Sequence, residues 1–275
     1  AMSGLVEGQE VEFNGTSCRV LKIDAEENNC RIQAGDCPPV WCKAWELSGS
    51  QADSDLQTVQ IHFRSKDSAD VEAWHALFGD ESVALMGLSN KEKELVRTAF
   101  TIQHRDIFDG CDSSGGSCAV VSPANSFGDM TGGIDFVYLK RFGHGLQVQL
   151  QERIRREREG ELPVGDALIL KTGEDPIRYC ISAPTMRVPL DIRGTCNAYL
   201  AFRAVLVAVR KHNLTACGTD RISDILCPGL GTGIGLLPAQ TCAYQMLQAF
   251  RQQVLGRHGC FQSATLDHGE LVKLR

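Results

Sequence analysis

From residue 56 onward, the sequence alternates short apolar segments of strand character with longer segments whose apolar residues recur at helical spacing. This alternation constrains the fold most, because strands followed by helices pack as an α/β sandwich around a mixed sheet. Residues 117–124 are almost continuously apolar, as in a strand that is buried on both faces. The predicted strands cover residues 56–63, 82–87, 99–104, 117–124, 166–173, 177–184 and 221–230. The predicted helices cover residues 68–79, 133–143, 146–160, 197–213 and 238–256.

The first 50 residues follow a different pattern, with several short strand candidates separated by turns that contain Gly or Asn. Their rhythm is similar to that of a small SH3-like or Tudor-like barrel, so we expect residues 1–50 to form a small all-β domain. Trp41 and Trp45 either pack in its core or form a ligand cage. The polar stretch 48–55 predicts a linker, which we place at residues 51–55.

Composition and charge narrow the classes of function. The net charge of −6 argues against broad binding to a phosphate backbone, which needs a clustered basic surface. No segment approaches the roughly 20 apolar residues that a membrane-spanning helix needs, so we expect no membrane partner. No basic start is followed by an apolar run, which predicts a cytoplasmic or nuclear protein. Residues 257–275 carry no clear pattern and are expected to form a tail or an edge element.

The 12 cysteines allow two interpretations. Cys180, Cys227 and Cys242 stand inside apolar segments, where a free thiol behaves as a small buried hydrophobe. Without a secretory signal, reduced thiols are the favoured interpretation. A structural zinc site among the cysteines of residues 30–42 is the alternative, but no CxxC pair occurs there or elsewhere. We therefore predict no metal site.

Two glycine-rich loops follow buried strands, VVSPANSFGDMTGGID at residues 120–135 and LCPGLGTGIGLLP at residues 226–238. In open α/β sheets, ligands bind beyond the carboxyl ends of the strands. Glycine there lets backbone N–H groups approach an anion, and a helix N-terminus adds a favourable field. Two such loops on one sheet indicate a phosphorylated ligand that is held from both sides. Neither loop has the Rossmann or the P-loop spacing, so those two nucleotide-binding classes are excluded.

These loops, together with RDIFD at residues 105–109, resemble three motifs of the macro domain family in the family's order. SPAN, TGG and ID stand where that family has NAAN, a glycine run and V-D. Thr232 to Pro238 resembles its T-G-I-x-x-aromatic-P diphosphate loop, and RDIFD resembles its G-D-I segment. The stretches SPANSFGDMTGGID and APTMRVP are similar to a bacterial-type subgroup. The resemblance covers about residues 56–256 and implies a three-layer α/β/α sandwich that binds ADP-ribose without a cofactor.

The resemblance assigns the adenine and diphosphate contacts. Asp106 would accept a hydrogen bond from the adenine amine, and the amide of Ile107 would support the diphosphate. The second glycine loop would present its backbone amides to the diphosphate. The competing interpretation of each position is local turn chemistry. The diphosphate loop residues are Gly231, Thr232, Gly233, Ile234 and Gly235.

The resemblance also implies how the distal ribose is held. Asn125 and Ser122 would contact the ribose, and Gly132 and Gly133 would admit it close to the backbone. Asn125 alternatively holds its own loop as a turn residue. Asp135 lies at the distance from Asn125 that hydrolytic members show, and would activate a water near C1″. Asp135 is equally explained as a carboxylate at a helix start, which the helix dipole favours.

The sequence departs from the family pattern at four places. Ser122 replaces the first Asn of NAAN, and the four-glycine run is reduced to residues 130–133. These two changes affect the ribose contacts. Leu139 replaces a His of the hydrolases, and Leu237 replaces the aromatic residue before the proline. These last two changes affect the hydrolytic mechanism more than binding.

Three functions therefore remain open. An eraser would hydrolyse ADP-ribose from a protein or a nucleic acid end, or deacetylate O-acetyl-ADP-ribose, with Asp135 and Asn125 at the catalytic centre. A reader would bind ADP-ribose without turnover, and Leu139, Leu237 and the N-terminal domain favour it. A scaffold with a vestigial pocket is the third, and the intact glycine loops and Asp106 argue against it. The expected partner is ADP-ribose or an ADP-ribosylated macromolecule, and nucleic acid enters only as a modified substrate.

Overall fold

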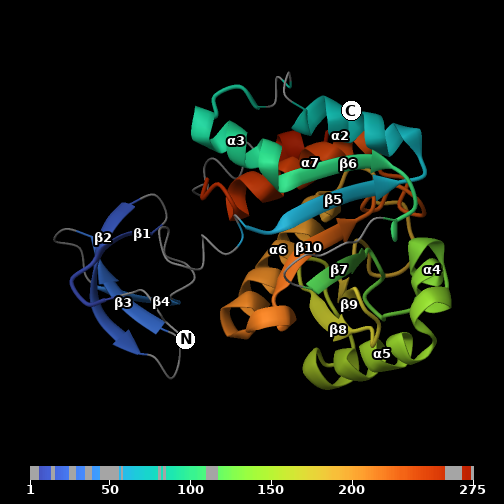
Figure 1. The fold of residues 1–275 in the computed structure, drawn as a ribbon, viewed down its shortest axis with the longest axis horizontal. Helices are drawn as coiled ribbons and strands as arrows, with labels where there is room; N and C mark the ends of the chain where they lie inside the picture. Colours follow the sequence, from blue (N-terminus) through green and yellow to red (C-terminus); the bar gives the residue numbers. More distant parts are fainter. Residues whose placement is uncertain are drawn as a thin grey trace.

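The computed structural model describes residues 6–13, 16–24, 29–34, 39–43, 56, 58–79, 82, 85–109, 117–257 and 268–273. Two sheets organise these residues, one of four strands and one of six (Figure 1). The predicted linker at residues 51–55, and the polar stretch 48–55 around it, lie outside the described residues.

The N-terminal sheet is an antiparallel meander in the order β1-β2-β3-β4. Its strands are β1 (Glu10–Phe13), β2 (Thr16–Asp24), β3 (Asn29–Gln33) and β4 (Val40–Lys43), which confirms the strand prediction for this region. Alternate side chains build one small apolar cluster, because successive strand residues point to opposite faces. Its buried members are Val11, Cys18, Val20, Cys30, Ile32 and Cys42. Closure into an SH3-like or Tudor-like barrel stays a prediction.

Trp41 does not belong to that cluster. Its side chain is 51% exposed, so the interpretation as a core residue is wrong for Trp41. The strand alternation explains this, because the neighbouring Cys42 points to the opposite, buried face. Trp45 and Cys37 lie outside the described residues, so neither an aromatic cage nor a cysteine site is described.

The larger sheet is mixed, as predicted, with the strand order β6-β5-β10-β7-β9-β8. Five neighbouring strands are parallel, and the edge strand β8 runs antiparallel to β9. The parallel strands direct their carboxyl ends to one edge, where ligands bind in open α/β sheets. The strands are β5 (Gln60–Ser65), β6 (Phe100–His104), β7 (Ser117–Ser122), β8 (Leu168–Lys171), β9 (Ile177–Ser182) and β10 (Ile222–Cys227).

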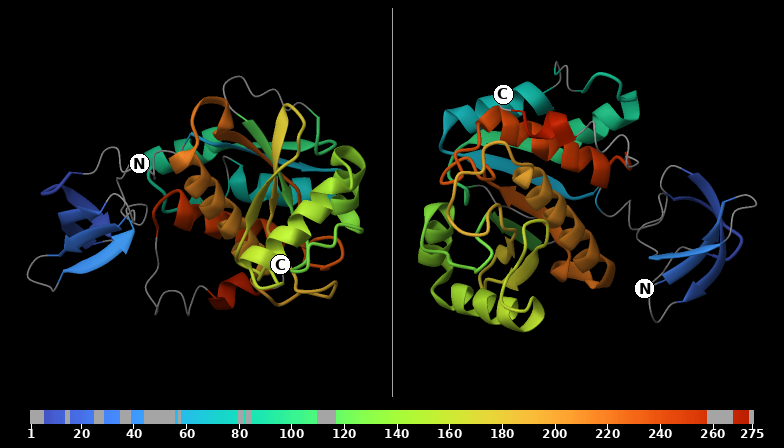
Figure 2. Two further views of the ribbon diagram at one scale, coloured as in Figure 1. Left: turned by 90° about the horizontal axis from the view of Figure 1, so that it is seen from below. Right: turned by 180° about the vertical axis from the view of Figure 1, so that it is seen from behind.

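Helices cover both faces of this sheet and give three layers (Figures 1 and 2). The buried strand β7 shows why, since Ala119 and Val121 join one apolar cluster whereas Cys118 and Val120 join the other. The first face carries α2 (Ser68–Phe78), α3 (Asn90–Ala99), α6 (Asn197–Thr215) and α7 (Ala239–Gln253). The second carries α4 (Gly133–Phe142) and α5 (Gly145–Glu157). A 3₁₀ helix, η3 (Gly218–Asp220), precedes β10.

Two elements differ from the prediction. The strand expected at residues 82–87 is wrong, because its described residues form a turn. The following helix α3 was not predicted, because its sequence is mostly charged and contains few apolar residues. Ser89 and Glu92 nevertheless form a reciprocal capping box at its start, a signal that the sequence does carry. The described part of the C-terminal segment is a helical turn at residues 268–271 rather than an edge strand.

Most of the described cysteines are buried and form no disulfide bond, in agreement with the thiol interpretation. Cys118 is disulfide-bonded, so that interpretation is wrong at this position. Across the described ranges, no group of three or more His, Cys, Asp or Glu side chains is placed to hold a metal ion. None of the helices described here combines the length and apolar character that crossing a bilayer requires.

The separate apolar clusters lead to a prediction about truncation. The N-terminal cluster shares no member with the two clusters of the larger sheet. A chain that starts at residue 56 should therefore unfold cooperatively, with a thermal midpoint within a few degrees of that of the larger domain in the full chain. Scanning calorimetry of both proteins measures this. A truncated chain without a cooperative transition would show that the N-terminal residues complete the larger core.

Candidate functional site

A pocket of about 460 Å³ opens at the carboxyl ends of the parallel strands. Five segments wall it, and each follows a strand of the larger sheet, namely β5, β6, β7, β9 or β10. Both predicted glycine loops are among them, as is the segment at residues 105–107. The tertiary structure therefore brings together the three motifs that the sequence analysis singled out. The segments lie within residues 64–70, 105–107, 123–137, 185–189 and 228–235.

Asn125 organises the first glycine loop. Its Oδ1 accepts hydrogen bonds from the backbone N–H groups of Phe127 and Asp129, and its Nδ2 donates to the carbonyl of Asp129 at 2.8 Å. The turn role is therefore present. Because a side-chain amide has two N–H donors, one remains for a ligand in the pocket that Asn125 lines.

Helix α4 begins at the end of this loop, beside the pocket. Its N-cap is Gly132, which offers no side chain to accept from the first N–H groups of the helix. Gly133 has a φ of 55°, a left-handed value that glycine adopts without strain. Gly132, Gly133 and Ile134 all line the pocket. The helix thus presents uncapped backbone donors and its positive dipole end to whatever occupies the pocket.

Asp135 is a buried carboxylate in the first turn of α4. Its side chain lines the pocket but is only 7% exposed. Burial raises the pKa of Asp135 to about 7, although the hydrogen bond from Ser122 acts in the opposite direction. Charge repulsion from Asp129 adds to the increase. The carboxyl group can therefore gain or release a proton near neutral pH, as a general acid or base must.

Ser122 lies beneath Asp135 rather than on the pocket wall. Its side chain is fully buried at the end of β7, and its hydroxyl donates to Asp135 Oδ1 at 2.5 Å. Ser122 is not among the residues that line the pocket, and its direct contact with a ligand stays a prediction. The substitution of Ser for Asn in the motif replaces an amide with a hydroxyl that reaches the carboxylate.

The glycines of the second loop have different local constraints. A Cβ on Gly231 would lie 2.4 Å from Ile192 Cδ1, and a Cβ on Gly235 would lie 2.7 Å from Ile192 Cγ1. Both positions therefore require glycine for packing. A Cβ on Gly233 would meet nothing within 4 Å, so this position opens toward the pocket that it lines.

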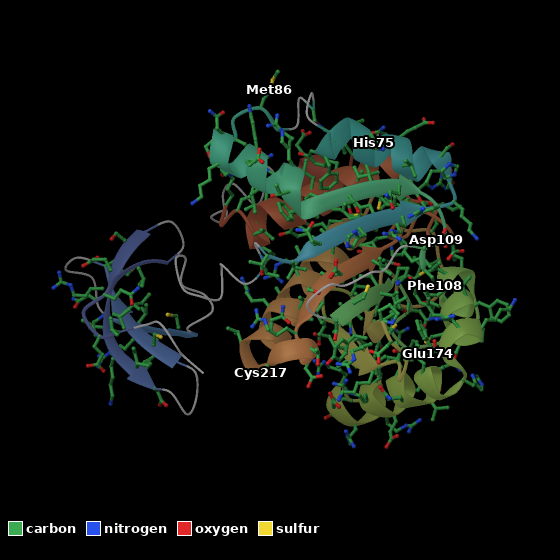
Figure 3. All side chains as sticks on the ribbon, in the orientation of Figure 1. His75, Met86, Phe108, Asp109, Glu174 and Cys217 are labelled. Atoms are coloured by element: carbon green, nitrogen blue, oxygen red, sulfur yellow. The ribbon has the colours of Figure 1, made fainter. Side chains whose placement is uncertain are left out.

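Asp106 lines the pocket on the segment that follows β6. Lys66 forms an ion pair with its carboxylate at 2.7 Å, and the backbone N–H of Phe108 donates to it at 3.1 Å. The hydrogen bond and charge of Lys66 lower the pKa of Asp106, so it is an ionised acceptor. Ile107 is buried, and Phe108 packs beside α4 with its ring 5.8 Å from that of Tyr138 (Figure 3).

The structure adds lining residues that the sequence analysis missed. Asp70, in the first turn of α2, accepts from Ser65 Oγ at 2.9 Å and from Thr232 Oγ1 at 3.4 Å. It thereby connects the start of α2 to the second glycine loop. Burial raises the pKa of Asp70. Its helix-start position is common to many carboxylates, so the sequence alone gave no signal for this contact.

The basic residues that line the pocket all stand on one wall. Arg64 lies in β5, Lys66 follows that strand, and Arg105 follows β6. The backbone N–H of Arg105 donates to the carbonyl of Ser65. Arg64 is buried, and desolvation and the charge of Arg105 both lower its pKa. This wall carries the positive side chains of the pocket, and the carboxylate of Asp106 lies beside it in an ion pair with Lys66.

The raised pKa of Asp135 predicts a pH-dependent change in stability on substitution. In the unfolded chain the carboxyl ionises near pH 4, but in the native protein it holds its proton up to about pH 7. The wild type therefore loses stability as pH rises across this window. The free energy of unfolding of Asp135→Asn should equal that of wild type at pH 4 and exceed it by roughly 2–4 kcal/mol above pH 7.

Urea denaturation at a series of pH values measures this difference. Glu152→Gln, at an exposed position on α5, is the control and should show no such trend. Parallel stability curves for Asp135→Asn and wild type would show that Asp135 titrates as an ordinary surface carboxyl group.

Comparisons with known proteins identify a family for part of the chain. Residues 121–246 match the family model described as Macro domain. An uncharacterised protein of Aquifex aeolicus is 32% identical over 135 residues, which span 48% of this chain and 72% of the relative. An uncharacterised protein of Aeropyrum pernix is 33% identical over 131 residues, which span 48% of this chain and 62% of that protein.

Solved structures show similarity at lower identity. A macrodomain of Oceanobacillus iheyensis with ADP aligns with a TM-score of 0.42 and 22% identity, over 51% of this chain and 71% of the other. The macrodomain of Mycobacterium tuberculosis DarG aligns with a TM-score of 0.40 and 23% identity, over 49% of this chain and 81% of the other. On the family model and the Aquifex relative, this chain belongs to the macro domain family.

Proposed function

We propose that this protein binds ADP-ribose in the pocket and hydrolyses ADP-ribosyl linkages with Asp135 as the general base. The observation that carries the catalytic part is the buried Asp135 carboxylate, whose pKa is raised to about 7 beside a pocket. The hydroxyl of the buried Ser122 also donates to this carboxylate and holds it in place. The match to the macro domain family supports the ligand.

The charge distribution of the pocket orients the ligand. The ionised Asp106 would accept from the adenine amine, at the side of the pocket where Lys66 holds it. The diphosphate would lie between the second glycine loop and the uncapped start of α4, where backbone N–H groups and the dipole favour an anion. The neutral distal ribose would then rest on Gly132 and Gly133, next to Asp135.

The proposed reaction is hydrolysis at C1″ of the distal ribose. Asp135 takes a proton from a water molecule whose oxygen forms the new bond to C1″. The bond from C1″ to the carrier breaks, and its electron pair leaves with the carrier, which is then protonated. The products are ADP-ribose and the unmodified carrier. Because Asp135 must be ionised to act as the base, the rate should rise with pH through about 7.

A reader without turnover is the second candidate. Two observations favour it. Asn125 is engaged in holding its own loop, and Leu139, at the position of a hydrolase histidine, packs against the apolar cluster beneath α4. A reader does not need a base that titrates near neutral pH. A time course of ADP-ribose release from a panel of Glu-, Ser-, Arg- and nucleic-acid-linked ADP-ribose separates the two functions, because a reader would release none.

Gly233→Val tests binding. A side chain at this position meets no neighbour within 4 Å, so it should enter the pocket without disturbing the fold. Wild type should bind ADP-ribose with a Kd on the order of 1 μM by calorimetry, and the variant should show no binding. Gly145→Val, at an equally open position on α5, is the matched control and should bind normally. Normal binding by Gly233→Val would place the ligand elsewhere.

Asp135→Asn tests catalysis. The amide keeps the shape of the side chain but accepts no proton, so hydrolysis should fall by at least about 10²-fold while ADP-ribose binding persists. Ser122→Ala removes a hydrogen bond that lowers the pKa of Asp135, so the midpoint of the pH–rate profile should move to higher pH. Initial rates over a range of pH measure both effects. An unchanged rate for Asp135→Asn would assign the water activation to another group.

A further inference from the structure

Exposed apolar side chains gather around the end of the pocket near Asp135. Seven of the thirteen exposed large hydrophobic side chains in the described part of the chain lie on the loops and helix start that frame this end. Single exposed apolar residues are ordinary, but a gathering of this kind is typical of an interaction surface. The seven side chains form an apolar rim and are Phe127, Phe136, Val137, Val188, Leu190, Ile234 and Leu236.

Backbone hydrogen bonds join the loops that carry the rim side chains. The loop that follows β9 carries Val188 and Leu190 and lies between the two glycine loops. It is bonded to the first loop from the N–H of Ser126 to the carbonyl of Arg187 at 3.1 Å. It is bonded to the second loop from the N–H of Ile192 to the carbonyl of Gly235 at 2.9 Å. These two hydrogen bonds join the three loops that carry Phe127, Val188, Leu190, Ile234 and Leu236.

The backbone at Leu236 supports a role other than folding. Leu236 has a φ of 53°, a left-handed conformation that an apolar side chain rarely adopts. Its side chain is also 56% exposed, so burial does not compensate for the strained backbone. Strained residues of this kind cluster at functional sites. Ile234, on the same loop, reaches toward Gly132, where its Cδ1 would lie 3.3 Å from a Cβ.

The charges around the rim indicate the chemistry of its partner. Arg187 forms an ion pair with Glu161 at 2.8 Å, and Arg193 forms one with Asp191 at 2.5 Å. Lys140 lies over an aromatic ring of the rim. A nucleic acid strand binds through cations that neutralise its phosphates, and here the two arginines are already paired with carboxylates. A polypeptide supplies apolar side chains that match the exposed surface.

We propose that the apolar rim docks the polypeptide that carries the ADP-ribosyl group, and that the protein prefers modification sites flanked by apolar side chains. This inference rests on the proposed function, because it requires the distal ribose beside Asp135. A group attached to C1″ then leaves the pocket at the end framed by the rim. Residues on either side of the modified one contact the rim before the linkage is cleaved.

Fluorescent peptides that carry ADP-ribose through a stable aminooxy linkage test the proposal on the full chain. One peptide has Leu and Phe beside the modified residue, and the other has Ser at both places. The apolar peptide should bind roughly tenfold more tightly by fluorescence anisotropy. The double variant Val188→Ser/Leu190→Ser should remove this difference. Its affinity for free ADP-ribose should be unchanged, because neither residue is part of the pocket wall.

Two further variants guard against indirect effects. Met86→Ser/Val148→Ser changes two exposed apolar residues away from the pocket and should keep the preference for the apolar peptide. Leu236→Asn should fold as well as wild type, because Asn tolerates a left-handed backbone better than Leu. It should lower the affinity for the apolar peptide and leave the affinity for the Ser peptide unchanged. Loss of the preference in the control, or its persistence in both rim variants, would overturn the proposal.

The remaining outcomes are distinguishable. Equal affinity for the two peptides, with normal binding of free ADP-ribose, would overturn the rim proposal and leave the proposed function standing. The same sugar on an oligonucleotide should not respond to the double variant, and a loss there would assign the rim to nucleic acid. Sedimentation of the full chain should show a monomer. A dimer that dissociates in the double variant would instead assign the rim to a second copy of the chain. Failure of free ADP-ribose to bind would instead overturn the proposed function.

Discussion

The hydrogen bond from Ser122 to Asp135 joins the centre of the sheet to the pocket. Ser122 ends β7, which is buried along its whole length, and Asp135 begins α4. The same helix is fixed a second time, because the Tyr138 hydroxyl donates to the carbonyl of Val121 at 2.9 Å. The carboxylate is therefore held on two rigid elements rather than on a mobile loop. Its burial there gives a carboxyl group with a pKa near neutrality.

Packing of the loops sets the shape of the pocket as much as the glycine motifs do. Ile192 fills the space beside Gly231 and Gly235, so these glycines are required by a protein contact. Asp70 ties Thr232 of the same loop to the start of α2. The loop is consequently supported from two sides, and Gly233 is left open toward the pocket. A loop supported in this way loses little conformational freedom when a ligand binds.

Most of the fold could be predicted from the sequence, because apolar periodicity reports directly on the buried faces of strands and helices. The errors occur where the apolar pattern is weak, or where it does not distinguish a buried from an exposed face. Helix α3 is mostly charged and buries only Val96 and Ala99, so its pattern did not stand out. Trp41 is aromatic and lies on a strand, yet it faces outward, because side-chain type does not decide which face of a sheet is covered.

By itself, the sequence determined most of the strands and helices, although not α3, together with the two glycine loops and the family to which they belong. It also determined that Asp106, Asn125 and Asp135 are polar positions beside strand ends, since local patterns carry that information. Only the tertiary structure decided that Ser122 donates a hydrogen bond to Asp135, and that Lys66 forms an ion pair with Asp106. These contacts join residues from different segments of the chain. Desolvation, which raises the pKa of Asp135, likewise depends on everything packed around the carboxylate and not on its neighbours in sequence.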